Sequence, residues 1–181
     1  ANALGEDWLT IIVPRHPDRG NKIAAASGGA PQRSLGQFPS MDHNLYIMDS
    51  FGEMGSLFSL AHLVILGGSF MPKGGHNPLE PAAFGLPIIT GPHIFKNSAE
   101  FAGLRDVGVV FDVAETDDGL DATITGQKLA KLVIAIANDK PARRRIASAA
   151  KAYAMAANNR SDSAARKIVL ETMKQPVKTN R

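Results

Sequence analysis

The chain has 181 residues, of which 44% are hydrophobic and 20% charged, so it is long enough for one domain with a substantial core and is not a disordered chain. Its formal net charge of +3 suits an anionic ligand but falls short of the dense basic patches of nucleic-acid-binding proteins. Because the chain has no cysteine, disulfides, thiolate metal sites and cysteine nucleophiles are excluded.

Short apolar runs alternate with amphipathic segments along the chain. The apolar runs predict buried strands over residues 9–13, 45–48, 63–66, 87–90 and 107–112. Helical spacing predicts helices over residues 18–26, 52–62, 78–85, 97–104, 127–138 and 141–173, the last one broken at Asn158 and Asn159. This alternation is typical of an α/β fold with a Rossmann-like parallel sheet and helices on both faces.

The domain organisation follows from the same pattern. We expect one nucleotide-binding domain over residues 1–140, followed by a helical segment over residues 141–181. The chain begins almost directly on a strand, so we interpret it as the later part of a longer protein. The longest apolar stretch, residues 57–66, is too short to span a bilayer, and the chain itself is expected to be soluble.

Two loops follow the first two predicted strands. Pro14 and Arg15 come directly after the first one, where open α/β sheets bind ligands, and a guanidinium suits bidentate recognition of a phosphate. An ordinary surface arginine is the alternative. Residues 49–54 follow the second strand, and their backbone and Phe51 could hold a base. The alternative there is a helix cap by Asp49 or Ser50.

The most informative segment is residues 67–92, which read GGSFMPKGGHNPLEPAAFGLPIITGP and follow directly on the third predicted strand. A buried strand, then glycines, then a capped helix is how α/β proteins aim backbone N–H groups at a phosphate. Within it, Asn77 to Glu80 has the pattern of a capping box, with Pro78 at the first helical position and Asn77 accepting from the N–H of Glu80. Capping alone would also explain these residue types.

Lys73 and His76 flank Gly74 and Gly75 within that segment. A single lysine or histidine on a loop is usually solvated or structural. At this place both side chains could neutralise a phosphate or a sugar carboxylate. Common self-contained active-site motifs are missing, because the sequence has no Walker loop, G-x-G-x-x-G, H-E-x-x-H or G-x-S-x-G.

Three segments together resemble one enzyme family. IIVPRHPDR, MDSFGEMGSLFSLA and GGSFMPKGGHNPLEPAAFGLPIITGPHIFKN are similar to the C-terminal half of 3-deoxy-D-manno-octulosonic acid (Kdo) transferases. The motifs cover roughly residues 9–105. The resemblance implies the two-domain GT-B glycosyltransferase fold, whose C-terminal domain binds the sugar nucleotide CMP-Kdo. It also implies that CMP is contacted by Pro14, Arg15, Gly52, Glu53, Met54, Asn77, Pro78, Leu79 and Glu80, with Lys73, Gly74, Gly75 and His76 as further donor contacts.

The resemblance further implies a metal-independent enzyme that transfers Kdo to a lipid A precursor at the cytoplasmic face of the bacterial inner membrane. The family's N-terminal domain, which holds the expected catalytic base and the membrane-associating surface, has no counterpart in this sequence. The first strand of the C-terminal domain is also missing. We therefore expect a donor site without a catalytic residue, in a chain that is inactive alone.

Other functions remain open from the sequence. One alternative is the C-terminal domain of another GT-B enzyme, such as a UDP-sugar transferase or a nucleotide-sugar epimerase. A second is a nucleotide-binding module without catalysis. No nucleic-acid partner is expected.

Overall fold

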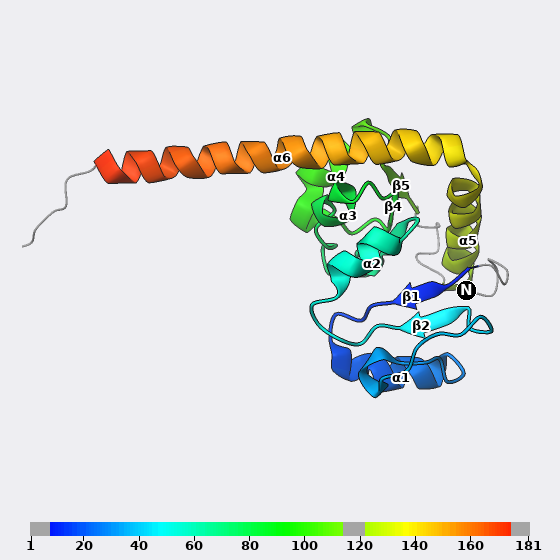
Figure 1. Ribbon diagram of the computed structural model, residues 1–181. Coiled ribbons are helices and arrows are strands. Elements are labelled where there is room, and N and C mark those ends of the chain that lie inside the picture. Colours follow the sequence, from blue (N-terminus) through cyan, green and yellow to red (C-terminus); the bar gives the residue numbers. More distant parts are fainter. Residues whose placement is uncertain (1–7, 114–121, 175–181) are drawn as a thin grey trace, which may run out of the picture. The chain divides into compact units, whose positions relative to one another are not determined.

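The computed structural model describes residues 8–113 and 122–174. The chain folds as two compact units, Ala1–Ala61 with Leu120–Asn138 and His62–Gly119 with Asp139–Arg181, called unit 1 and unit 2 below. The strands described form two ladders, β1–β2 in unit 1 and β3–β4–β5 in unit 2, and every pair is parallel. The expected α/β class, with parallel strands flanked by helices, is confirmed (Figure 1). The expected division at residue 140 stays a prediction.

Unit 1 is built on two short strands. These are β1 (Thr10–Ile12) and β2 (Leu45–Ile47), with Ile12 opposite Ile47. The remaining elements are η2 (Pro17–Arg19), α1 (Gly20–Ala26), η3 (Arg33–Leu35), α2 (Met54–Leu60) and α5 (Ala122–Asn138). α1 packs beside β2 (Figure 1), where Ala24 and Ala30 form a core with Ile47.

The first strand is less buried than its sequence predicts. Leu9, Ile11 and Val13 are 41%, 37% and 36% exposed. They alternate with Thr10 and Ile12, which the register places on the same face as Leu45 and Ile47. Because the core with α1 forms on the Ile47 face, the opposite face of β1 stays partly open, and the expectation of a fully buried strand is wrong.

Unit 2 contains the larger core. β4 (Ile88–Thr90) is fully buried between β3 (Val64–Leu66) and β5 (Val110–Asp112). The other elements are η4 (Gly67–Ser69), α3 (Leu79–Ala83), η5 (Phe95–Asn97), α4 (Ser98–Asp106) and α6 (Lys140–Lys174). The side chains of Phe101 and Leu104 on α4 are completely buried in this core. Arg105 joins α4 to β5 through two 2.7 Å hydrogen bonds to Asp112.

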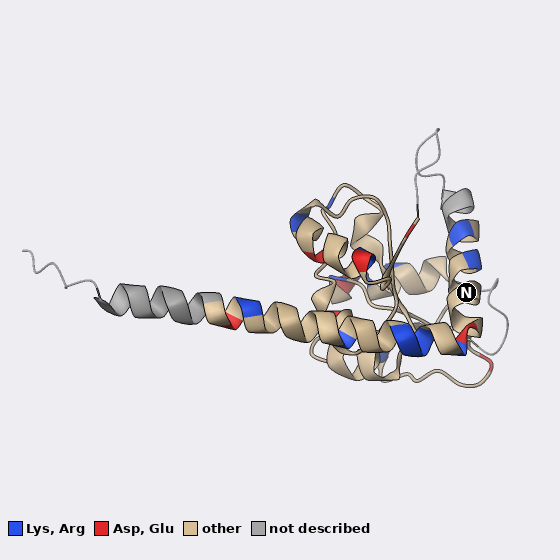
Figure 2. Ribbon diagram, turned by 90° about the horizontal axis from the view of Figure 1, so that it is seen from above, with Lys and Arg blue, Asp and Glu red and all other residues tan. Residues whose placement is uncertain are grey.

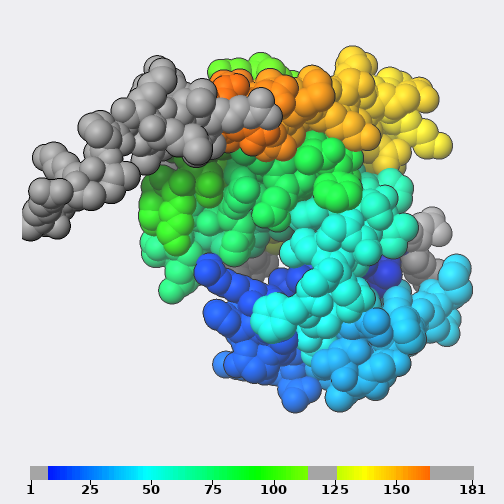
Figure 3. Space-filling view, turned by 60° about the vertical axis from the view of Figure 1, so that its left-hand side comes forward, coloured from blue at the N-terminus to red at the C-terminus, as the bar shows by residue number. Residues whose placement is uncertain are grey.

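α6 is one continuous helix of 35 residues, so the predicted break at Asn158 and Asn159 is wrong. Asparagine lowers helix propensity by only a fraction of a kcal/mol. Just before the two asparagines, Ala154 packs in the core of unit 2 and Ala157 is also buried, which holds this part of the helix in place. In the space-filling view the orange part of α6 lies across the green surface of unit 2 (Figure 3). Its first turns carry a run of Lys and Arg (Figure 2), of which Arg144 and Arg145 are exposed.

Small residues allow α6 to lie close to α3. Ala150 is completely buried. A Cβ placed on Gly85, just after α3, would lie 3.2 Å from both the Cβ and the carbonyl oxygen of Ala147 on α6. Gly85 also has a φ of +80°, which favours glycine. Among the described residues, no helix is long and apolar enough to cross a membrane.

We expect Gly91→Ala to destabilise the chain. A Cβ at this position would lie 2.6 Å from the Ser69 carbonyl oxygen and 2.9 Å from its carbonyl carbon. Because backbone atoms cannot move aside as a flexible side chain can, we predict a loss of about 1–3 kcal/mol in the free energy of unfolding, measured in urea. The matched control is Gly67→Ala, where a Cβ meets nothing within 4 Å. Equal effects of the two substitutions would contradict the packing described for Gly91.

Candidate functional site

In unit 1, Pro14 and Arg15 follow the carboxyl end of β1. This end is fixed to β2 by the N–H of Met48, which donates to the Ile12 carbonyl at 2.9 Å. Arg15 is exposed, and no ion pair of Arg15 is found within the described part of the chain. Its guanidinium is therefore available to an anion at the end of the strand, the position that the sequence predicts for it.

Asp49 lies at the carboxyl end of β2 and is 4% exposed. Its carboxylate accepts hydrogen bonds from the backbone N–H of Ser34 at 2.8 Å and from the Ser34 hydroxyl at 2.7 Å. Burial alone would raise the pKa of Asp49, but the hydrogen bonds from Ser34, together with those from the backbone of Asp49 and Arg33, outweigh it and lower that pKa. A Cβ on Gly20 would lie 2.0 Å from Asp49 Oδ2, so this glycine lets α1 begin beside the carboxylate.

The next turn depends on Glu53. The Ser50 hydroxyl donates to Glu53 Oε1 at 2.7 Å, and Arg33 Nε donates to both carboxylate oxygens at 3.1 and 3.2 Å. The hydrogen bond from Ser50, together with Arg33, lowers the pKa of Glu53. Asp49 thus bonds to Ser34, and Ser50 bonds to Glu53. The alternative that Asp49 or Ser50 caps α2 is wrong, because α2 begins after Glu53 without a side-chain cap.

The conformation of this turn requires a glycine. Gly52 has a φ of +84°, a region that side chains with a Cβ rarely adopt. Phe51 beside it is 80% exposed. The turn therefore presents its backbone and the Phe51 ring to solvent, while the hydrogen bonds from Arg33 fix the Glu53 carboxylate.

In unit 2, a buried serine ties together the loops that follow β3 and β4. The Ser69 hydroxyl donates to the Leu66 carbonyl at 2.5 Å and accepts from the N–H of Gly91 at 2.7 Å. The N–H of His93 also donates to the Ser69 carbonyl at 3.0 Å. Since parallel strands end at the same edge of their sheet, these bonds fix two neighbouring loops at the edge where α/β proteins bind ligands.

The glycine pair lies in the first of these loops. Gly74 and Gly75 have φ values of +88° and +75°. The Gly74 carbonyl accepts from the N–H of Lys96, in the second loop, at 3.2 Å. Lys73 and His76 on either side of the pair are exposed. The structure thus brings the predicted basic residues to the predicted edge of the sheet.

The capping box at Asn77 differs from the prediction. Asn77 Oδ1 accepts from the N–H of Leu79 at 3.0 Å, not from that of Glu80. A side-chain oxygen of Asn reaches the N–H two residues ahead in an Asx turn, and α3 accordingly begins at Leu79, after Pro78. A capping box would also have the Glu80 carboxylate accept from the N–H of Asn77, and no such bond is found in the described residues. Glu80 is exposed, so its carboxylate is open to solvent.

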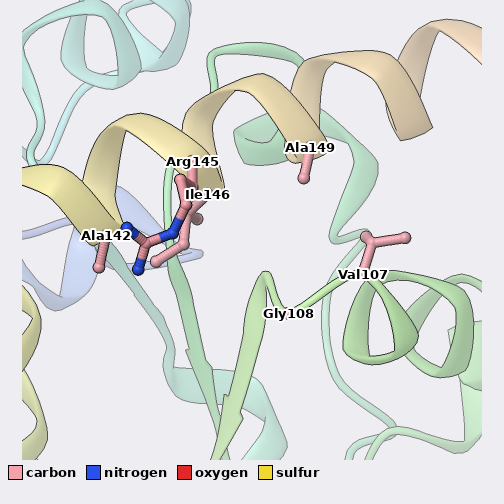
Figure 4. Close-up of a pocket in the computed structure, with 6 residues that line it drawn as sticks. All are labelled: Val107, Gly108, Ala142, Arg145, Ile146 and Ala149. Carbon is pink, nitrogen blue, oxygen red and sulfur yellow. The ribbon is translucent and has the colours of Figure 1, made fainter.

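One further hollow lies in unit 2 (Figure 4), with a volume of about 430 Å³. It is lined by Val107, Gly108, Ala142, Arg145, Ile146 and Ala149. Val107 and Gly108 precede β5, so this hollow lies at the amino end of a strand, opposite the edge where the loops after β3 and β4 meet. It is therefore separate from the candidate site.

Comparison with known proteins confirms the resemblance to Kdo transferases. The chain is 34% identical over 145 residues to the 3-deoxy-D-manno-octulosonic acid transferase of Haemophilus influenzae, which covers 78% of this chain and 32% of that protein. It is 44% identical over 96 residues to the enzyme of the same name from Rickettsia bellii, covering 51% of this chain and 23% of that one. The chain thus spans about a third or less of these relatives. No family model matches the sequence.

One solved structure is similar over most of the chain. It is the C-terminal CMP-Kdo binding domain of WaaA from Acinetobacter baumannii, with a TM-score of 0.71 and 26% identity over 84% of this chain and 79% of that one. The expected fold class, that of the C-terminal domain of a GT-B glycosyltransferase, is therefore confirmed.

We expect Asp49→Asn to weaken the link between η3 and the end of β2. Because the native pKa is lowered, the carboxylate adds stability that is complete above its unfolded pKa of about 3.9 and is lost as the pH falls through the lower folded pKa. The variant should lose about 1 kcal/mol at pH 7 and show a flatter fall in stability below about pH 4, measured by urea unfolding across pH.

The matched control for this experiment is Asp42→Asn, since Asp42 is exposed. It should change neither the stability at pH 7 nor its acid dependence. If both variants behave like the wild-type chain, the hydrogen bonds from Ser34 do not stabilise unit 1 as described.

Proposed function

We propose that this chain, a relative of the Kdo transferases, is the domain that binds the donor CMP-Kdo in a glycosyltransferase of lipopolysaccharide core biosynthesis. The observation that carries the proposal is its similarity, over 84% of its length, to a solved CMP-Kdo binding domain. The loops that follow β1, β2 and β3 support it, because they carry the segments in which the sequence resembles the family.

Arg15 is assigned the phosphate of CMP. It is exposed, follows the carboxyl end of β1 and has no ion pair in the described residues. A guanidinium can donate two parallel hydrogen bonds to one phosphate, which favours arginine over lysine at such a position. Pro14 before it restricts the backbone through its ring, so that the approach to Arg15 is rigid.

The turn 52–54 is assigned the nucleoside. The Glu53 carboxylate is fixed by Arg33 and Ser50, and each carboxylate oxygen can accept more than one hydrogen bond. Glu53 can therefore accept from a ribose hydroxyl or a base amino group without losing its internal bonds. Exposed Phe51 offers an aromatic face beside it.

Asn77 to Glu80 completes the set of CMP contacts that the resemblance implies. The Asx turn at Asn77 fixes the entry to α3, and Glu80 in its first turn is exposed. A carboxylate there can accept hydrogen bonds from sugar hydroxyls. Lys73, Gly74, Gly75 and His76 are proposed as further donor contacts.

The chemistry of the transfer fits these roles. The bond between the Kdo anomeric carbon and the CMP phosphate oxygen breaks, and its electron pair leaves with the phosphate. Arg15 would stabilise the charge that develops on that phosphate. An acceptor hydroxyl forms the new glycosidic bond and gives its proton to a base, and we assign that base to no residue of this chain.

The acceptor and the place of the reaction complete the proposal. We propose a lipid A precursor as acceptor and the cytoplasmic face of the bacterial inner membrane as location, with both contacts made by another part of the enzyme. The chain alone would then bind the donor without turning it over.

The first test is base preference. The chain should bind CMP more tightly than UMP in calorimetric titrations, because the proposed donor is a cytidine nucleotide. Arg15→Ala should weaken CMP binding roughly tenfold or more, since a charge-assisted hydrogen bond contributes about 1.5–3 kcal/mol. Arg144→Ala, which removes an exposed arginine from α6, is the control and should have no effect. Equal affinity for CMP and UMP would favour another GT-B donor.

The second test concerns metal independence, which remains a prediction. If Arg15 supplies the positive charge that faces the phosphate, CMP binding needs no divalent cation. The dissociation constant for CMP should therefore be the same in EDTA and in millimolar Mg²⁺. CMP binding that requires Mg²⁺ would show that Arg15 does not suffice.

A further inference from the structure

We propose that Lys96 determines specificity for the sugar of the donor, by binding its carboxylate together with Lys73 and His76. This inference rests on the proposed function and goes beyond it, because it assigns recognition of the sugar acid to a residue outside the expected CMP contacts. It would make the domain selective for nucleotide-activated sugar acids over neutral sugars.

Lys96 is fixed against the loop that carries the other two basic residues. Its backbone N–H donates to the Gly74 carbonyl at 3.2 Å. A Cβ placed on Gly74 would lie 2.6 Å from Lys96 Cγ and 2.9 Å from its Cδ. The aliphatic part of Lys96 therefore lies directly over Gly74, the residue that follows Lys73. Such a close approach requires a glycine at position 74.

His76 is fixed in a similar way on the other side of the glycine pair. A Cβ placed on Gly68 would lie 2.8 Å from both Cδ2 and Nε2 of the His76 ring. Gly68 belongs to η4, whose Ser69 binds the loop that leads to Lys96. The His76 imidazole thus packs on Gly68, and the aliphatic part of Lys96 packs on Gly74. The buried Ser69 joins the loop of these two glycines to the loop that leads to Lys96.

The basic side chains at this edge of unit 2 are open to solvent. In the parts of the chain that the structure describes, no ion pair involves Lys73, His76 or Lys96. All three side chains are exposed. The loops after β3 and β4 therefore offer two ammonium groups and an imidazole to solvent, at the carboxyl ends of the strands, where ligands of parallel sheets bind.

The donor has two anionic groups, and the proposed function uses only one of them. CMP-Kdo carries a phosphate, which we assign to Arg15, and the carboxylate of the sugar acid. That carboxylate is bonded to the anomeric carbon, the same carbon that is linked to the phosphate. Because Arg15 is assigned to the phosphate, the carboxylate needs a cationic partner of its own, and the basic side chains of unit 2 offer one.

The test compares CMP with CMP-Kdo as ligands of the chain. The wild-type chain should bind CMP-Kdo more tightly than CMP. Lys96→Gln should weaken CMP-Kdo binding on the order of tenfold and change CMP binding by less than about twofold, because only the contact to the sugar is lost. Lys96→Arg keeps the charge and should retain most of the CMP-Kdo affinity.

Lys22→Gln is the matched control, since it removes an exposed lysine from α1 in unit 1 and should leave both affinities unchanged. CMP binding by Lys96→Gln shows that this variant is folded. If Lys96→Gln binds CMP-Kdo as the wild type does, or unfolds in urea like the wild type but loses CMP and CMP-Kdo equally, the carboxylate subsite is wrong while the proposed function stands. If the wild-type chain binds neither ligand, both proposals fail.

Discussion

The parallel direction of the strands is the constraint on which the rest of each unit depends. β3, β4 and β5 run in the same direction, so the chain between two of these strands must pass over a face of the sheet. The loops after β3 and β4 therefore meet at one edge. In unit 2 the buried hydroxyl of Ser69 makes that meeting rigid by bonding to both loops. In unit 1 Asp49 and Glu53, which follow β2, bond to Ser34 and Arg33 of η3 and fix the turn after β2 in a similar way.

Rigid loops matter for a domain that binds a small anionic donor. A side chain that is already held in place loses little conformational entropy when the ligand arrives. Two side chains are held in this way: Lys96 packs over Gly74, and Glu53 is bonded to Arg33 and Ser50. These internal contacts set their positions, while their polar ends reach solvent. The glycines of these loops are therefore positions of close approach or positive φ rather than points of flexibility.

Much of this could be predicted from the sequence, because short apolar runs and glycine-rich turns are local signals. The strands, the α/β class and the resemblance to Kdo transferases all follow from such segments. The bond between Arg33 and Glu53 could not be predicted, since it joins residues 20 positions apart that belong to η3 and to the turn after β2. The break at Asn158 was wrong because packing of the neighbouring alanines outweighs a small propensity cost. The assignment of Arg15, residues 52–54 and residues 77–80 to CMP stays a prediction.

The most direct test of the central claim, that this chain binds the CMP part of the donor, is a titration of the isotope-labelled chain with CMP, followed by NMR of the backbone amides. The account predicts that the amides of Arg15, Gly52, Glu53, Asn77 and Glu80 shift together and saturate at one CMP concentration, while those of the hollow near Arg145 do not move. Shifts that avoid these residues, or no saturable shifts at all, would contradict it.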